Sequence, residues 1–153
     1  RIGAAINAIS PSIYFVVSAS LALGLALQET GATQFLTELF LYLTNDRSPI
    51  FILSALMLLL ALLTNIVSNN AAAVIGTPIG LGIAQQLGLP AEPFVLAVLF
   101  GANMSYATPM AYKTNLLVMS AGNYTFREFV KVGVPLTILM WLVLTWLLSW
   151  LYF

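Results

Sequence analysis

The residues of this chain that can do chemistry gather in two short polar breaks inside long apolar runs. The first break is the stretch 64–70, Thr-Asn-Ile-Val-Ser-Asn-Asn, and the second is Ala107-Thr108-Pro109, with Lys113 shortly after it. Hydroxyl, amide and carbonyl oxygens suit a hard cation such as Na⁺, whereas free N–H groups at a helix start attract anions. The two breaks therefore predict binding of small ions.

The composition excludes most other kinds of chemistry. The 153 residues include no histidine and no cysteine, which removes imidazole bases, thiolate ligands and disulfides. Charged residues make up 7% and hydrophobic residues 61%, against roughly 25% and 45–50% in a soluble domain. We therefore expect an all-α integral membrane protein that is not an enzyme and uses no organic cofactor. The net charge of zero gives no reason to expect a nucleic-acid partner.

Uncharged runs and helix-ending residues predict the elements that position the two breaks. A membrane-spanning helix needs about 20 mostly apolar residues. The pattern predicts a span at 11–27, an interfacial amphipathic helix at 32–43, two apolar arms around the first break at 48–89, a broken span at 93–121, an interfacial helix at 125–133 and a final span at 134–153. The run Thr125-Phe126-Arg127-Glu128 has the capping-box form that starts the helix at 125–133.

The arms around the first break allow two interpretations. In one, 48–89 is a re-entrant hairpin whose turn, Ser68-Asn69-Asn70, lies near the middle of the bilayer and presents unpaired carbonyls and N–H groups. In the other, each arm crosses the membrane and the turn is a surface loop. The absence of charge throughout 48–91 favours the hairpin only weakly, so both interpretations stay open at this point.

Lys113 follows the second break inside an otherwise apolar span. An ammonium group at that depth is costly and usually functional, so Lys113 is a candidate counter-charge for an anionic substrate. The alternatives are that its side chain reaches the membrane surface or pairs with a carboxylate elsewhere in the protein. No Asp or Glu lies within an apolar run, which argues against a proton-relay antiporter built on this segment alone.

The two breaks and the tail of the chain resemble the C-terminal inverted repeat of the divalent anion/sodium symporters, a citrate-transporter-like family. Ser68-Asn69-Asn70 is similar to the second Ser-Asn-Thr hairpin of that family, the run 107–115 to its broken helix, and the run 122–135 to the approach to its last helix. Asn70 departs from the usual threonine, so the shape of the pocket differs. Because the chain begins with Arg1 rather than Met, we expect a segment of a longer protein.

The resemblance implies symport of a small divalent anion, sulfate or a dicarboxylate, coupled to Na⁺ and driven by an elevator-type motion. It implies that Na⁺ is held by Thr64, Val67, Asn69 and Ala107, with Val67 and Ala107 acting through their backbones. It implies substrate contacts from the turn and the second break, to which the counter-charge is added: Ser68, Asn69, Asn70, Thr108, Pro109 and Lys113. The implied partners are the anion, the lipid bilayer, the N-terminal half of the same protein and a second copy in a homodimer.

Basic residues predict the orientation of the chain in a bacterial inner membrane that it crosses several times. The positive-inside rule places Arg1, Arg127 and Lys131 in the cytoplasm and Arg47 outside. Two further functions stay open from the sequence: an anion exporter or Na⁺/H⁺ antiporter of the same fold, and a membrane anchor or sensor that transports nothing.

Overall fold

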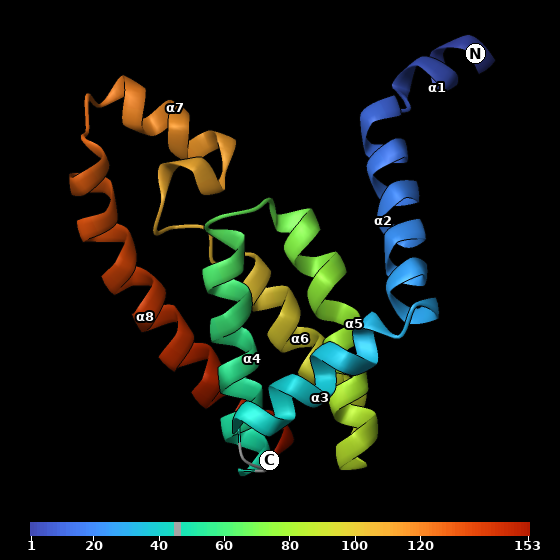
Figure 1. Cartoon of the computed structure of the whole chain (residues 1–153). Helices are drawn as coiled ribbons and strands as arrows, with labels where there is room; N and C mark the ends of the chain where they lie inside the picture. The colour runs from blue at the N-terminus through green and yellow to red at the C-terminus, as the bar shows by residue number, and fades with distance from the viewer. Residues whose placement is uncertain (45–46) are drawn as a thin grey trace.

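The computed structural model describes residues 1–44 and 47–153, and the described part is built from helices without strands. Figure 1 shows their arrangement, and their bounds are α1 Ile2–Ala8, α2 Pro11–Glu29, α3 Ala32–Thr44, α4 Pro49–Thr64, α5 Asn69–Leu87, α6 Ala91–Ala102, the 3₁₀ turn η1 Pro109–Ala111, α7 Lys113–Ala121 and α8 Phe126–Tyr152. Within these residues, α2 and α8 are long and apolar enough to cross a membrane. The predicted fold class, an all-helical membrane domain with a helical hairpin and a broken helix, is confirmed.

The core of the molecule lies where α4, α5 and α6 pack together. Two glycines allow these helices to approach closely, as is usual for helix packing in membranes. A Cβ atom at Gly101 of α6 would lie 2.6 Å from the carbonyl oxygen of Met57 in α4, and one at Gly76 of α5 would lie 2.6 Å from a methyl carbon of Leu60. The fully buried large side chains of this core include Ile52, Leu53, Leu56, Met57, Leu60, Ile83, Phe94 and Val98.

Both the first and the last long helix lie outside this core, but they differ in how they join it. α2 has no buried residue and meets the rest of the chain through α3 and α5. Its first half extends away from the body together with α1 (Figure 1). α8 is fixed more firmly, because the indole N–H of Trp141 donates to the carbonyl of Ser54 in α4 at 2.9 Å and Thr145 donates to the Ser54 hydroxyl at 3.3 Å.

The C-terminal region differs from the sequence prediction in one respect. The predicted interfacial helix at 125–133 and the predicted span at 134–153 form one helix, α8, of 27 residues. The predicted capping box is confirmed, with reciprocal hydrogen bonds of 3.2 and 2.9 Å between Thr125 and Glu128. Pro135 does not divide the helix, because a proline removes only one helical hydrogen bond and α8 is packed against the body on both sides of it.

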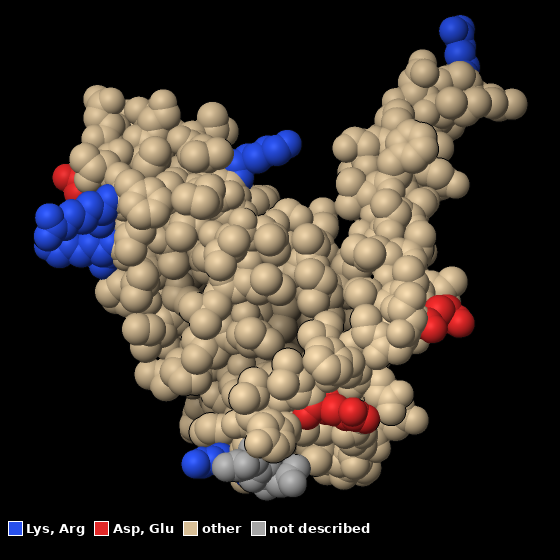
Figure 2. All heavy atoms as spheres, viewed as in Figure 1, with Lys and Arg blue, Asp and Glu red and all other residues tan. Residues whose placement is uncertain are grey.

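Charge is distributed around the margins of the molecule. On the face that Figure 2 shows, most of the blue and red side chains lie at the margins and at the projecting ends. One red group lies on the lower part of the body, and the middle of the body is tan. Figure 1 shows that the turn between α4 and α5 lies below the level of α7 and of the start of α8.

Candidate ion-binding site

The first break joins two half-helices through four residues. α4 ends at Thr64, and α5 starts at Asn69 with Ser68 as its N-cap. The Ser68 hydroxyl accepts a hydrogen bond from the N–H of Ala71 at 3.2 Å, which is the usual way in which a serine begins a helix. The C-terminus of one helix and the N-terminus of the next thus lie together, and such ends carry unpaired carbonyl and N–H groups.

Thr64 and Asn69 place two oxygen atoms beside each other in this break. Thr64 is fully buried, and its hydroxyl oxygen lies 2.8 Å from the carbonyl oxygen of Ala102 in α6 and 2.9 Å from the amide oxygen of Asn69. A hydroxyl has one proton, which Thr64 can give to only one of these acceptors at a time. When the proton goes to Ala102, the oxygens of Thr64 and Asn69 lie 2.9 Å apart with no proton between them.

Asn65 links the first break to the second, although the sequence analysis assigned it no role. Its amide NH₂ donates to the carbonyls of Ala61 at 2.6 Å and Met104 at 3.0 Å. Its amide oxygen accepts from the N–H groups of Ala107 at 3.1 Å and Thr108 at 3.2 Å. The Thr108 hydroxyl also donates to the Asn65 carbonyl at 2.8 Å. One buried side chain therefore holds two segments that lie about 40 positions apart in the sequence.

The second break starts earlier than the sequence predicted. The pattern placed it at Thr108-Pro109, but α6 already ends at Ala102 and the chain is irregular until η1. Buried irregular backbone needs partners for its polar groups. Asn65 supplies some of them, and the NH₂ of Asn115 in α7 supplies others by donating to the carbonyls of Ser105 at 2.5 Å and Thr108 at 3.2 Å.

The predicted Na⁺ ligands fall into this one region. Thr64 and Asn69 are in direct contact, and the N–H of Ala107 donates to the side chain of Asn65, the residue after Thr64. Val67 is half-buried in the turn, where its N–H donates to Leu63 at 2.9 Å. Among the hydrogen bonds of residues 1–44 and 47–153, none ends on the carbonyl of Val67 or on that of Ala107.

The predicted substrate residues are less uniformly placed. Ser68 and Asn70 are exposed, Asn69 and Thr108 are half-buried, and Pro109 is buried. The hydroxyl proton of Thr108 is already donated to Asn65, so this hydroxyl cannot also donate to an anion. Lys113 is exposed and is the first residue of α7, whose N-terminus has no side-chain cap. No hydrogen bond in the described chain joins Lys113 to the turn 68–70.

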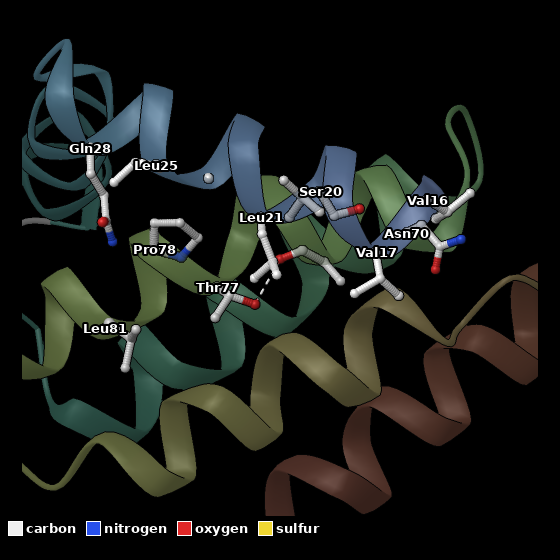
Figure 3. Close-up of a pocket in the computed structure, with 13 residues that line it drawn as sticks. Val16, Val17, Ser20, Leu21, Leu25, Gln28, Asn70, Thr77, Pro78 and Leu81 are labelled. Carbon is white, nitrogen blue, oxygen red and sulfur yellow. Dashed lines mark hydrogen bonds between the residues drawn. The ribbon is translucent and has the colours of Figure 1, made fainter. Parts of the chain in front are cut away.

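A groove of about 590 Å³ lies beside the turn, between α2 and α5. Figure 3 shows that Asn70 lies at one end of it and Gln28 at the other, with apolar side chains between them. The lining residues are Val16, Val17, Ser20, Leu21, Gly24, Leu25, Gln28, Asn70, Ala73, Val74, Thr77, Pro78 and Leu81. The groove therefore runs along the side of α5 that faces α2, and it begins at the first break.

Together these features define a class of protein. Helices that break inside an uncharged membrane domain, with buried oxygen atoms and half-helix ends around the breaks, are characteristic of secondary transporters. A family model described as citrate transporter matches residues 1–153, and the chain belongs to this family. The resemblance drawn from the two breaks is thus confirmed, and the family is one of transporters rather than of enzymes.

Individual relatives support the same assignment. The chain is 34% identical to an uncharacterized transporter of Synechocystis over 146 residues, which are 95% of this chain and 24% of the relative. It is 35% identical to the uncharacterized transporter YfbS of Escherichia coli over 130 residues, 85% of this chain and 21% of the relative. It is 30% identical to the probable sodium/sulfate cotransporter 3 of Chlamydomonas reinhardtii over 148 residues, 95% of this chain and 16% of the relative. The chain thus spans a quarter or less of the length of these relatives.

Proposed function

We propose that the protein containing this chain is a symporter that moves a small divalent anion, sulfate or a dicarboxylate, together with Na⁺. The observation that carries this proposal is the pair of oxygens from Thr64 and Asn69, 2.9 Å apart in a buried helix break. Relatives named sodium/sulfate cotransporters, at about 30% identity, support Na⁺ as the coupling ion and sulfate as one substrate.

We propose that Na⁺ is bound by the side-chain oxygens of Thr64 and Asn69 and by the carbonyls of Val67 and Ala107. Hard cations take oxygen ligands at short range, about 2.3–2.6 Å for Ca²⁺, and two oxygens 2.9 Å apart can both reach one such ion. Ala102 supports this arrangement by offering the Thr64 proton an acceptor other than Asn69. The two carbonyls have no competing donor among the described residues.

We propose that the anion is bound between the N-terminus of α5 and the second break, by Ser68, Asn69 and Asn70 from the first and by Thr108, Pro109 and Lys113 from the second. The hydroxyl and the N–H of Thr108 both donate to Asn65, so we propose that Thr108 and Pro109 line the site without donating to the anion. Lys113 supports this placement. Its ammonium group lies at a helix N-terminus, and both of these positive features attract an anion.

We propose further that 48–89 is a re-entrant hairpin. The 16 residues of α4 rise about 24 Å, which is less than the roughly 30 Å of a bilayer core. α5 contains Pro78 and three glycines, and it is not among the described helices that are long and apolar enough to cross a membrane. The position of the turn below the start of α8 in Figure 1 agrees with this proposal.

The assembly and motion of the whole protein belong to the same proposal. We infer a homodimer that crosses the bacterial inner membrane several times, in which the N-terminal half supplies the other part of the binding site. We also infer an elevator-type motion of the body around α4–α7, with α3 as the connecting arm.

The test is uptake of labelled sulfate and labelled succinate by proteoliposomes that hold the full-length protein. We expect accumulation of one or both anions when Na⁺ is higher outside, and none when Na⁺ is equal on both sides or replaced by K⁺. Uptake that does not depend on Na⁺ would contradict the proposed coupling and favour the exporter or antiporter of the same fold. Folded protein that takes up neither anion would contradict the proposed substrate class.

A further inference from the structure

The segment 106–108 of the second break is held by two different helices. Figure 1 shows the chain passing between α4 and α8 after the end of α6. From the α4 side, the amide oxygen of Asn65 accepts from the N–H groups of Ala107 and Thr108. From the α8 side, a Cβ atom at Gly133 would lie 2.0 Å from the carbonyl oxygen of Tyr106 and 2.8 Å from the Cα of Ala107. Nothing larger than glycine fits at position 133 unless the segment moves.

The hydrogen bonds of Asn65 control the direction of the Ala107 carbonyl. The C=O of Ala107 and the N–H of Thr108 belong to one planar peptide group, in which they point in opposite directions. None of the described peptide bonds is cis. The bond of 3.2 Å from the Thr108 N–H to Asn65 therefore fixes the plane in which the carbonyl lies.

Asn65 has no capacity left to bind an ion itself. An asparagine side chain has two N–H donors and one oxygen with two lone pairs. Both donors are used on Ala61 and Met104, and the oxygen accepts from Ala107 and Thr108. The side chain is also 92% buried, since 8% of its surface is exposed. It can act on a bound ion only through the backbone that it holds.

We propose that Asn65 and Gly133 are positioning residues for the coupling ion, which they serve by holding the Ala107 carbonyl where it completes a cation site with Thr64 and Asn69. This inference rests on the proposed function. It means that α8 affects the affinity for the ion through the backbone of 106–108, although α8 contributes no ligand. The backbone of 106–108 is contacted from both sides. The side-chain oxygen of Asn65 accepts its N–H groups, and Gly133 packs against it where a side chain would not fit.

The experiment measures the Na⁺ concentration that gives half-maximal anion uptake, and separately the maximal rate, in proteoliposomes with the full-length protein. Asn65→Leu keeps the approximate size of the side chain and removes all four of its hydrogen bonds. Asn103→Leu is the matched control, because Asn103 is exposed and bonds only to Leu99 of its own helix. Gly133→Ala tests the other side of the segment, with Gly3→Ala as its control because a Cβ atom there meets nothing within 4 Å.

We expect Asn65→Leu and Gly133→Ala to raise the half-maximal Na⁺ concentration about three- to tenfold, the range that corresponds to the worth of one ordinary hydrogen bond. Maximal rates at saturating Na⁺ should stay within about twofold of the wild type, and both controls should keep its Na⁺ dependence. If Asn65→Leu does not assemble, Gly133→Ala still decides the question. An unchanged Na⁺ dependence in Gly133→Ala would overturn the inference.

The wild-type measurement separates this inference from the proposal on which it rests. Na⁺-dependent uptake by the wild type, with no shift in Asn65→Leu or Gly133→Ala, would overturn the positioning roles and leave the symporter standing. Uptake by the wild type that ignores Na⁺ would overturn the proposed coupling and the positioning roles together.

Discussion

Replacing Thr64 by valine separates the structural contribution of its hydroxyl from its contribution to ion binding. Valine has nearly the same shape, so the packing of this fully buried position is preserved. The change removes the donor to Ala102 and the oxygen beside Asn69. An unmade hydrogen bond in a buried place costs about 1–3 kcal/mol, so we expect the free energy of unfolding to fall by about that amount.

Thr64→Val should also weaken Na⁺ binding, by an amount similar to its effect on stability. One of four proposed oxygen ligands is lost, and a contact of a polar group with a charge is worth about 1.5–3 kcal/mol. Since each 1.4 kcal/mol is tenfold, we expect the half-maximal Na⁺ concentration for anion uptake to rise by roughly ten- to a hundredfold. Thr64→Ser keeps the hydroxyl and should stay within a few-fold of the wild type.

The assay is a Na⁺ titration of uptake together with thermal unfolding of the purified protein in detergent. Thr37→Val is the matched control, because Thr37 is also fully buried but its hydroxyl bonds only to Thr33 of its own helix, at 2.8 Å. The control should lose some stability and keep the Na⁺ dependence of the wild type. If Thr64→Val lowers the melting temperature but leaves the Na⁺ titration unchanged, the hydroxyl is only a structural link to α6 and the proposed cation site is refuted.

Three further changes test other parts of the fold. Asn69→Ala removes the second side-chain oxygen of the proposed cation site, so uptake should be lost while membrane insertion, followed by protease accessibility, stays normal; full uptake would contradict the site. Gly101→Ala forces α6 away from Met57 of α4 and should lower the free energy of unfolding by about 1–3 kcal/mol in thermal melts, whereas Gly24→Ala, where a Cβ atom meets nothing, should not. Lys113→Gln should raise the anion concentration for half-maximal uptake several-fold at fixed Na⁺. If the half-maximal Na⁺ concentration rises by the same factor, the result would argue against a direct contact of Lys113 with the anion.

The sequence predicted those features of the fold that depend on residues close to one another along the chain. Thr125 begins α8 through the predicted capping box with Glu128, which could be recognised from its immediate neighbours. Family membership followed from the same local patterns around the two breaks.

The features that the sequence did not predict depend on partners far along the chain. Asn65 looks like one more polar residue in a polar stretch, because its partners Met104 and Thr108 lie 39 and 43 positions away. The early end of α6 has the same cause, since the irregular backbone after Ala102 is stable only with the partners that Asn65 and Asn115 provide. Gly133 gives no signal in the sequence, because its meaning comes from the backbone of another segment.

The contrast between the two long apolar helices and the shorter ones at the centre has a consequence for how the protein is made. During synthesis, the insertion machinery can recognise α2 and α8 as complete membrane segments, since each satisfies the length and hydropathy of a span alone. α4 and α6, with 16 and 12 residues, and the proline-containing α5 do not. The central helices should therefore reach their final positions only after α2 and α8 have entered the bilayer. The orientation of the outer helices is then set before the proposed ion site forms.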